Sequence, residues 1–324
     1  MAERTGVLTG LDPATLVLLM SAGIAVDWLL GEPRRWHPLV GFGRYAKAIE
    51  QGLNRGAFRK CRGIAAWTIA VVPFVAVSAL LAWQSGEWHF VAGFAAHAAL
   101  LYFALGLRSL RDHMLPIAGA LAGGDIARAR VLTSYIVTRD TRSSDEPELA
   151  KAAVESLLEN GNDAVFGTLF WFAIAGGPGA LLFRLANTLD AMWGYCNERF
   201  HAFGWMAART DDGLNWIPAR LTALTYALLG DTRCALHCWR TQAASWSSPN
   251  AGPVMSAGAG ALCLALGGSA EYDGVVEQRP LLGLGRSAAA GDIERAWRLV
   301  VHSCIVWLAV SAVGVFIIER ILHA

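Results

Sequence analysis

Three long runs without a charged residue limit what this chain can fold into. Residues 64–83, 90–107 and 299–318 contain no Asp, Glu, Lys or Arg. A membrane-spanning helix needs about 20 mostly apolar residues. Each run is therefore predicted to cross a lipid bilayer as a helix, because a helix pairs its backbone polar groups within the segment.

Four further apolar segments are less regular. Residues 13–30 are predicted to form an uncleaved first span. Residues 165–183 are interrupted by Gly-Gly-Pro-Gly at 176–179, and residues 214–230 contain a proline and an arginine. Residues 251–268 are rich in Gly and Ala. Each of the last three segments is interpreted as a span, a re-entrant segment or a helix buried in protein.

The composition supports a membrane protein. Hydrophobic residues make up 55% of the 324 residues and charged residues 16%, against roughly 25% charged in soluble domains. The net charge of +1 gives no global field that would attract nucleic acid, so no nucleic-acid partner is expected. We predict an all-α, polytopic integral membrane protein with about four to six transmembrane helices, amphipathic cytoplasmic helices and, as an open alternative, a re-entrant segment. Residues 1–324 are predicted to form a single integral membrane domain.

Basic residues give an orientation. Of the 27 Lys and Arg residues, 21 lie in residues 32–63, 108–163 and 231–298. The positive-inside rule places these stretches in the cytoplasm, so the protein is expected in the bacterial inner membrane with its active site facing the cytoplasm. The polar stretch 184–213 is predicted to face the same side, because its residues should share a compartment with their substrates.

A first polar cluster follows the third predicted span. It consists of Thr138, Arg139, Asp140, Thr141 and Arg142. Two guanidinium groups and two hydroxyls around one carboxylate suit a phosphate group and its metal. The alternative is a helix end with solvated charges.

A helix is predicted to begin after this cluster. Ser143 with Glu146 and Asp145 with Glu148 both read as capping boxes. The helix should run to Asn160 and stop at Gly161. Residues 108–163 are accordingly predicted to be a cytoplasmic helical segment that carries part of the site.

Three acidic residues of this segment are candidate metal ligands. Glu155 and Glu159 share a helix face, and Asp163 follows the predicted helix end. Two or three carboxylates suit Mg²⁺ that is bound together with a nucleotide phosphate. The alternative is a solvated face on which Lys151 and Glu155 form an ordinary i,i+4 pair.

Further polar residues gather in two later stretches and in a turn before residue 251. Polar residues are expensive in so apolar a chain, so their clusters are candidate functional sites. Those retained as candidates are Asn187, Asp190, Asn197, Arg209, Asp211, Asp212, Arg220 and Asn250.

Several common functional motifs are absent from the sequence. The chain has no Walker A sequence and no His-Glu-x-x-His motif. Residues 283–288 fit a loose dinucleotide pattern, but no strand is expected before them, so we give this pattern little weight.

An ordered series of short motifs resembles the adenosylcobinamide-phosphate synthase family, also called the CobD/CbiB family. The series covers nearly the whole chain and consists of Asp27-Trp28-Leu29-Leu30-Gly31-Glu32-Pro33, His37-Pro38, Gly43-Arg44, Arg139-Asp140-Thr141, Glu155-Ser156, Glu159-Asn160, Asn187-Thr188-Leu189-Asp190, Gly194-Tyr195, Ala208-Arg209, Asp211-Asp212, Pro218-Ala219-Arg220-Leu221-Thr222, Ser248-Pro249-Asn250-Ala251-Gly252 and Gly267-Gly268. The chain departs from the family pattern at Thr138, at 164–168 and at 253–255.

The resemblance implies an ATP-dependent ligase of cobalamin biosynthesis. It would join adenosylcobyric acid, a corrinoid, to (R)-1-amino-2-propanol O-phosphate and give adenosylcobinamide phosphate. ATP and Mg²⁺ are the implied cofactors, and a complex with other enzymes of the pathway is an open expectation. A membrane Mg²⁺-dependent transferase acting on a phosphate substrate, or a small-molecule transporter, is the alternative.

The implied reaction suggests roles for the candidates. Glu155, Glu159 and Asp163 would hold the metal. Asp190, Asp211 or Asp212 would orient the amine or accept its proton. Binding of ATP and substrates would fall to Arg139, Asp140, Thr141, Arg142, Asn160, Asn187, Asn197, Arg209, Arg220 and Asn250.

Overall fold

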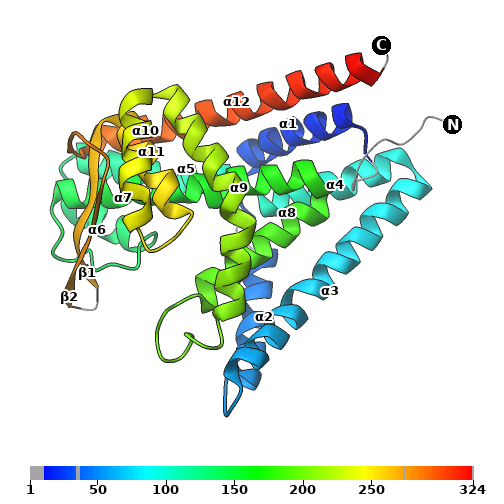
Figure 1. Cartoon of the computed structure of the whole chain (residues 1–324), viewed down its shortest axis with the longest axis horizontal. Helices are drawn as coiled ribbons and strands as arrows, with labels where there is room; N and C mark the ends of the chain where they lie inside the picture. The colour runs from blue at the N-terminus through cyan, green and yellow to red at the C-terminus, as the bar shows by residue number, and fades with distance from the viewer. Residues whose placement is uncertain (1–10, 34–36, 273, 323–324) are drawn as a thin grey trace. The chain divides into compact units, whose positions relative to one another are not determined.

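The computed structural model describes residues 11–33, 37–272 and 274–322, and Figure 1 shows that helices dominate it. Within these residues, five helical stretches are long and apolar enough to cross a membrane. They are Pro13–Leu30, Arg59–Trp88, Phe90–Ala122, Glu146–Trp193 and Ala290–Ile317. The expected all-α polytopic membrane fold is confirmed, and a small sheet that the sequence did not predict accompanies it.

The chain divides into two compact units. The first unit comprises Met1–Gly106, Gly167–Asn215 and Val310–Ala324, and the second comprises Leu107–Phe166 and Trp216–Ala309. Helices α9 (Trp205–Leu229) and α12 (Ala290–Leu322) contribute residues to both. This division does not test the predicted single membrane domain, which stays a prediction.

The first unit is built on long helices. They are α1 (Pro13–Leu30), α2 (Pro38–Leu53), α3 (Arg59–Trp88), α4 (Phe90–Ala104) and α8 (Gly167–Trp193). A core cluster forms where α2, α3 and α8 meet, and Phe42, Trp67 and Trp193 are its large members. The ring of Trp193 packs edge-on against that of Phe203, with centroids 5.2 Å apart. This cluster anchors the segment that follows α8.

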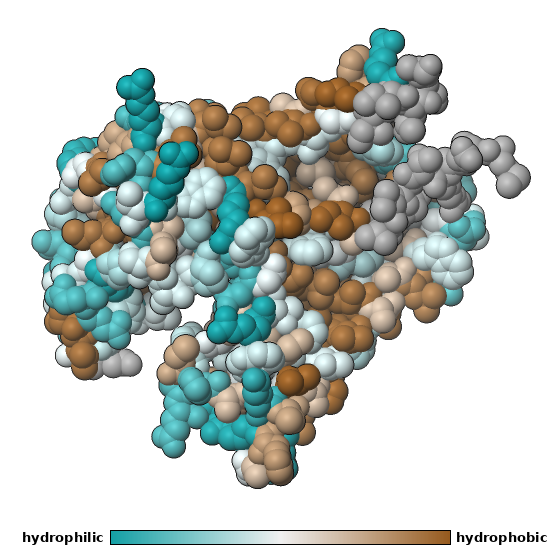
Figure 2. Space-filling view, in the orientation of Figure 1, coloured by the Kyte–Doolittle hydropathy of each residue, from teal (hydrophilic) through white to brown (hydrophobic). Residues whose placement is uncertain are grey.

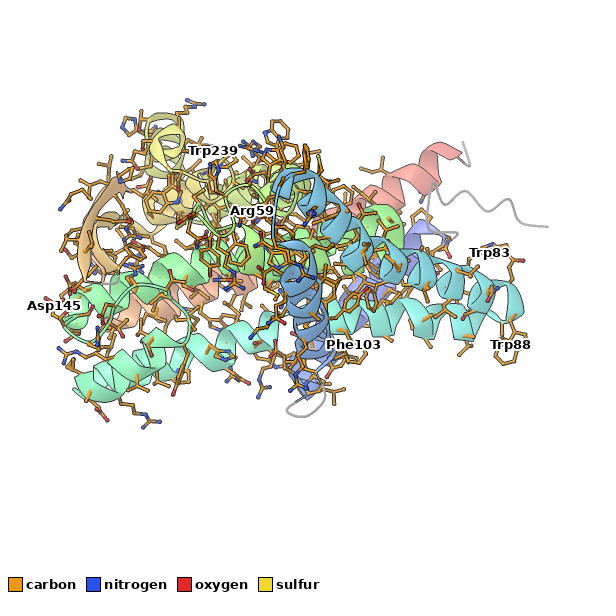
Figure 3. The ribbon with its side chains drawn as sticks, turned by 90° about the horizontal axis from the view of Figure 1, so that it is seen from below. Arg59, Trp83, Trp88, Phe103, Asp145 and Trp239 are labelled. Carbon is orange, nitrogen blue, oxygen red and sulfur yellow. The ribbon has the colours of Figure 1, made fainter. Side chains whose placement is uncertain are left out.

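Helix α3 presents an apolar outer face. Its exposed side chains include Val77, Leu80 and Leu81, and Figure 2 shows hydrophobic surface over the stretch that α3 occupies in Figure 1. Trp83 and Trp88 lie at its end (Figure 3) and are 63% and 85% exposed. Exposed apolar side chains that end in tryptophans are typical of a helix that reaches the membrane interface.

The predicted break in the fourth long span is present. Within α8, Ala175 and Gly176 leave helical geometry, and Gly176 has φ +61°. The break leaves the N–H of Gly177 without a partner in its own helix, and this N–H donates to Nδ1 of His97 on α4 at 2.9 Å. His97 therefore satisfies backbone at membrane depth, which is a structural role.

The second unit carries the shorter helices and the sheet. Its elements are α5 (Leu107–Ala122), α6 (Ile126–Ser134), α7 (Glu146–Gly161), α10 (Thr232–Gln242), the 3₁₀ turn Ala243–Ser245, α11 (Ala251–Leu262), β1 (Leu264–Tyr272), β2 (Val275–Leu282) and β3 (Arg286–Ser287). Of the two capping boxes predicted at the start of α7, that of Asp145 is confirmed, because Asp145 and Glu148 each accept from the other's backbone N–H. Ser143 is not the N-cap of this helix.

The predicted stop at Gly161 is wrong. The chain continues from α7 into a π-helical turn, Asn162–Phe166, and then into α8. A Cβ at Gly161 would lie 2.5 Å from Oη of Tyr226 and 3.1 Å from a methyl of Val300. The glycine is thus explained by close packing of the helices rather than by a left-handed turn.

The last third of the Gly/Ala-rich segment 251–268 is not helical. Helix α11 ends at Leu262, and every residue in it is buried. The chain then forms β1, which pairs antiparallel with β2 and, at its start, parallel with β3. The expectation that no strand precedes residues 283–288 is therefore wrong, because β2 ends at Leu282. The stretch itself contains β3, and β1 and β2 pair antiparallel, so it is not the turn of a parallel dinucleotide-binding unit.

Candidate functional site

A cavity of about 530 Å³ opens within the second unit. Its walls come from residues 136–139, from the last turns of α7, from residues 245–247 and from the β1–β2 hairpin. Arg139, Glu155, Glu159, Asn160 and Arg279 bring charged and amide groups to it. A volume of this size is in the range of small-molecule sites.

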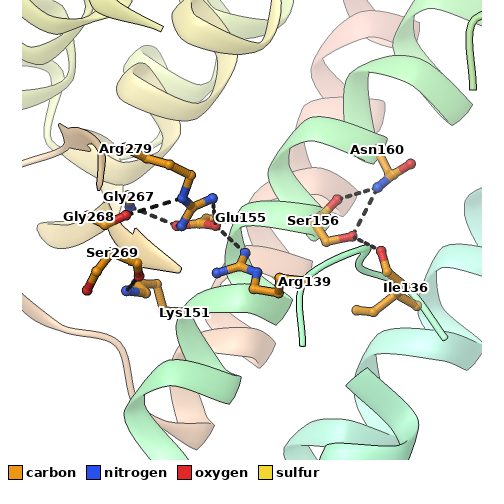
Figure 4. A network of polar contacts seen from close by, with 10 residues as sticks. All are labelled: Ile136, Arg139, Lys151, Glu155, Ser156, Asn160, Gly267, Gly268, Ser269 and Arg279. Atoms are coloured by element: carbon orange, nitrogen blue, oxygen red, sulfur yellow. Dashed lines mark hydrogen bonds and ion pairs between the residues drawn. The ribbon is translucent and has the colours of Figure 1, made fainter. Parts of the chain in front are cut away.

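Glu155 is the centre of a polar network in this cavity (Figure 4). The residue is only 3% exposed, so it does not lie on a solvated helix face. Arg139 donates to Oε2, and Arg279 donates from Nη1 to Oε2 at 3.1 Å and from Nη2 to Oε1 at 3.3 Å. The backbone N–H of Gly267 adds a bond to Oε1 at 2.7 Å. One buried carboxylate therefore holds two guanidinium groups.

An irregularity in the hairpin supplies the backbone donor. Gly267 faces Leu281 and Gly268 faces Arg279, so Pro280 is skipped in the register. Both glycines have φ +73°, a conformation that other residues rarely adopt. A β-bulge disrupts the regular ladder, so an amide there can serve a side chain. Proline fits the skipped position because it has no N–H to pair.

Arg139 and Arg279 differ in how many of their N–H groups donate hydrogen bonds within the protein. Arg279 also donates from Nε to the carbonyl of Gly268 at 3.2 Å, and its guanidinium lies 5.5 Å from the ring centre of Trp246. Within the described part of the chain, Arg139 makes one hydrogen bond, through Nη2 to Glu155. Its side chain lines the cavity and is 10% exposed. Because Nη2 makes the one hydrogen bond, Nε and Nη1 are available to a ligand there. Guanidinium groups of this kind suit phosphate oxygens.

The loop that carries Arg139 is tied to the sheet. The N–H of Asp140 donates to the carbonyl of Glu271 on β1 at 2.8 Å, and the hydroxyl of Thr141 donates to the carbonyl of Arg130 at 3.0 Å. Hydrogen bonds from Arg142 lower the pKa of the Asp140 carboxyl to about 2. Asp140 and Thr141 thus hold the loop in place, while the side chain of Arg142 is 88% exposed.

The end of α7 contributes the remaining predicted residues of this unit. Glu159 and Asn160 line the cavity, and Asn160 donates to the hydroxyl of Ser156 at 3.1 Å. Asp163 lies in the π-helical turn and accepts from Asn162 at 2.9 Å. In the described residues, no three acidic, Cys or His side chains gather as a metal cluster. The assignment of metal to Glu155, Glu159 and Asp163 stays a prediction.

Asp211 is a buried acid of the first unit. Its Oδ1 accepts from Asn187 at 3.3 Å and its Oδ2 from Asn215 at 3.1 Å. Burial raises the pKa of the Asp211 carboxyl to about 6, and the nearby charge of Asp212 acts in the same direction. A carboxyl that titrates close to neutral pH is suited to proton transfer.

Other candidates of the first unit have local partners. Asp190 lies against Gly194, where a Cβ would be 2.0 Å from Oδ1. Asn197 accepts from the N–H of Phe200 at 3.0 Å, which closes a turn. Arg209 and Asp212 pair at 3.3 Å on the face of α9.

Arg220 and Asn250 form a separate contact in the second unit. Nη1 of Arg220 donates to Oδ1 of Asn250 at 2.9 Å, and its guanidinium lies 4.3 Å from the ring centre of Trp216. This contact joins α9 to the turn before α11, and neither residue lines the cavity around Glu155.

The structure thus brings Arg139, Glu155, Glu159 and Asn160 to one cavity, as the sequence suggested for this segment. It adds Arg279 and Trp246, which the sequence analysis missed. Arg279 lies 124 residues from its partner Glu155, and nothing in the local sequence marks that pairing.

Comparison with known proteins places these features in a family. The sequence pattern of the CobD/Cbib protein family matches residues 20–300. The chain is 54% identical over 302 residues to the cobalamin biosynthesis protein CobD of Stutzerimonas stutzeri, which covers 93% of this chain and 98% of that relative. It is 51% identical over 314 residues to the protein of the same name from Chromobacterium violaceum, with 95% and 99% covered. No solved structure shows significant similarity to the chain.

Proposed function

The chain belongs to the CobD/Cbib protein family of cobalamin biosynthesis, and on that basis we propose that it is an ATP-dependent amide ligase. Its substrates are adenosylcobyric acid and (R)-1-amino-2-propanol O-phosphate, and its product is adenosylcobinamide phosphate. The observation that carries the proposal within the fold is the cavity in which Glu155 orients Arg139 and Arg279.

The proposed reaction has two steps. A carboxylate oxygen of the corrinoid acid attacks the terminal phosphorus of ATP, and ADP leaves with the electrons of the broken P–O bond. The amine nitrogen then attacks the acyl carbon, inorganic phosphate leaves, and the ammonium proton passes to a base. Asp190, Asp211 and Asp212 stay the candidates for that base, and burial raises the pKa of Asp211 to about 6.

The chain's cations bind the nucleotide in this proposal. Arg139 donates its remaining N–H groups to phosphate oxygens, while Glu155 and Gly267 fix the guanidinium of Arg279 beside it. Preorganised donors of this kind stabilise charge that develops during phosphoryl transfer. Seven further residues stay candidates for contact with the substrates. They are Arg142, Asn160, Asn187, Asn197, Arg209, Arg220 and Asn250.

Mg²⁺ fits the cavity through Glu159 better than through Glu155. Both oxygens of Glu155 are occupied by Arg139, Arg279 and Gly267, so a metal there would displace a guanidinium group. Glu159 lines the same cavity. Mg²⁺ bound with nucleotide usually takes one or two protein carboxylates and would supply charge neutralisation of the phosphates.

A reconstituted assay tests the ligase. Purified protein in detergent should release ADP only when ATP, adenosylcobyric acid and aminopropanol phosphate are all present, and a mass spectrum should show the amide product. ADP release that does not need the corrinoid acid, or a product without the amide, would refute the proposal. A transferase or a transporter predicts one of these two outcomes.

The membrane setting is part of the proposal. The apolar helices indicate a multi-pass membrane protein, and we place it in the inner membrane with the cavity facing the cytoplasm, where ATP is found. Contact with other enzymes of the pathway stays an expectation.

A further inference from the structure

A second, smaller cavity adjoins the first in the same unit. It has a volume of about 140 Å³ and is lined by Arg139 and Ser144 of the preceding loop, by Glu148 and Lys151 of α7, and by residues 269–271 of β1. We propose that it binds a short phosphomonoester that also carries an amine. This inference rests on the proposed function, whose amine substrate has that chemistry.

In this proposal, Lys151 is the main residue that binds the phosphate group of the ligand. Its Nζ makes one hydrogen bond within the described residues, a long one of 3.5 Å to the carbonyl of Ser269 (Figure 4). An ammonium group has three donors, so most of its capacity is unused. Arg139 adds N–H groups that Glu155 does not take. Arg139 and Lys151 both line this small cavity, so an anionic group there can meet two cations.

Carboxylates that line the same cavity match an amine. Glu148 accepts from the N–H of Asp145 through Oε2 at 3.1 Å, and Glu271 accepts from the hydroxyl of Ser143 through Oε2 at 3.3 Å. In the part of the chain that the structure describes, Oε1 of each is left for a cation. Inorganic phosphate would meet these carboxylates unfavourably, whereas a molecule with both charges can pair with the cations and with the carboxylates.

Size and position separate this ligand from ATP. A cavity of about 140 Å³ holds about five waters at ~30 Å³ each, which is too little for a nucleotide. The larger cavity has the volume for one. Arg139 lines both cavities, so it forms their common wall. A phosphorylated amine in the small cavity therefore lies next to the space in which the carboxylate is activated.

Direct binding tests the inference without ATP or corrinoid. Aminopropanol phosphate is titrated calorimetrically into the purified protein, its Lys151→Met and Lys151→Arg variants, and Lys47→Met as a control at an exposed position of α2. Loss of one charge-assisted contact should weaken binding about 10–100-fold in Lys151→Met. Lys151→Arg, which keeps the charge, should recover most of it, and Lys47→Met should match the wild type. Aminopropanol without the phosphate should bind weakly, and with equal affinity, to the wild type and to all three variants.

Two outcomes would overturn the inference. One is unchanged binding of aminopropanol phosphate in a folded Lys151→Met variant. The other is a KM for ATP that rises as much as the KM for the amine, which would assign Lys151 to the nucleotide. If Lys151→Met does not fold, equal wild-type affinity for aminopropanol and aminopropanol phosphate overturns it instead. A wild-type protein that binds the phosphorylated amine but makes no amide would refute only the ligase.

Discussion

Arg279 on β2 meets Glu155 on α7 through two hydrogen bonds, at 3.1 and 3.3 Å, across a sequence separation of 124 residues. Both side chains are nearly buried, at 14% and 4% exposed. Arg139 binds the same carboxylate, so the cluster carries one net positive charge before any ligand arrives.

Glu155→Gln and Glu159→Gln should both slow ligation, but for different reasons. Glu159→Gln removes a candidate metal ligand, so the rate should fall on the order of 10²–10³-fold and recover partly at high Mg²⁺. Glu155→Gln leaves two buried guanidinium groups with weaker compensation, so added Mg²⁺ should not restore its rate. The measurement is kcat for ADP release across a Mg²⁺ titration. Near-wild-type rates in both would move the metal to Asp190, Asp211 and Asp212.

Arg139→Lys should raise the KM for ATP about 10–100-fold. Lysine keeps the charge but loses the planar fork that binds Glu155 and a phosphate together. Arg108→Lys on α5 is the matched control, since Arg108 pairs with Asp112 on that helix at 2.8 Å. Steady-state kinetics with ATP varied would show the difference. An unchanged KM in Arg139→Lys would remove Arg139 from the nucleotide site.

Asp211→Asn should change how stability depends on pH. The raised pKa means that the folded protein holds a proton that the unfolded chain has released between about pH 4 and pH 6. The free energy of unfolding of the wild type should therefore fall as pH rises through this window and level off above it, by on the order of 1–3 kcal/mol from this group. Asp211→Asn should lack that component. Thermal unfolding of both proteins at several pH values measures it, and parallel curves would contradict it.

Gly161→Ala should destabilise the second unit by about 1–3 kcal/mol. The new methyl group would lie 2.5 Å from Oη of Tyr226, a buried residue whose hydroxyl donates to the carbonyl of Leu158. Gly119→Ala on α5 is the control, because nothing lies within 4 Å of a Cβ there. That change should be neutral or stabilising, since alanine favours a helix by ~0.5–1 kcal/mol. Equal melting temperatures for the two variants would argue against close packing at Gly161.

Cys196 reports the side of the membrane on which residues 184–213 lie. An impermeant thiol reagent should leave it unlabelled in intact cells and label it once the inner face is opened. Cys61 and Cys263 are also exposed, so the experiment needs a chain in which Cys196 is the sole cysteine. Labelling from outside would place this stretch opposite the predicted compartment.

Local signals in the sequence were sufficient for α7. The Asp145–Glu148 capping box and the spacing of Glu155 and Glu159 are short-range patterns, and both are borne out by the structure. The partner of Glu155 was not predictable in this way, because Arg279 reaches it only through the pairing of β1 with β2. Long-range pairings leave no periodic trace in a single sequence.

The sheet was missed for a related reason. Residues 251–268 form one apolar, Gly/Ala-rich run, yet the helix ends at Leu262 and the strand begins at Leu264. Cys263, with φ +53°, makes the turn between them. Neither strand alternates apolar and polar residues cleanly, because both also line cavities. The usual period of two is therefore absent.

The skipped residue in the hairpin sets a limit on how this family member tolerates changes in length. The register shift that skips Pro280 lies at Gly267 and Gly268. The N–H of Gly267, at this shift, donates to Oε1 of Glu155 rather than to the neighbouring strand. Deletion of Pro280 would restore a regular register, in which the ladder takes up the N–H of Gly267. A shortening of one residue, with no charge or large group removed, would thus cost Glu155 a partner.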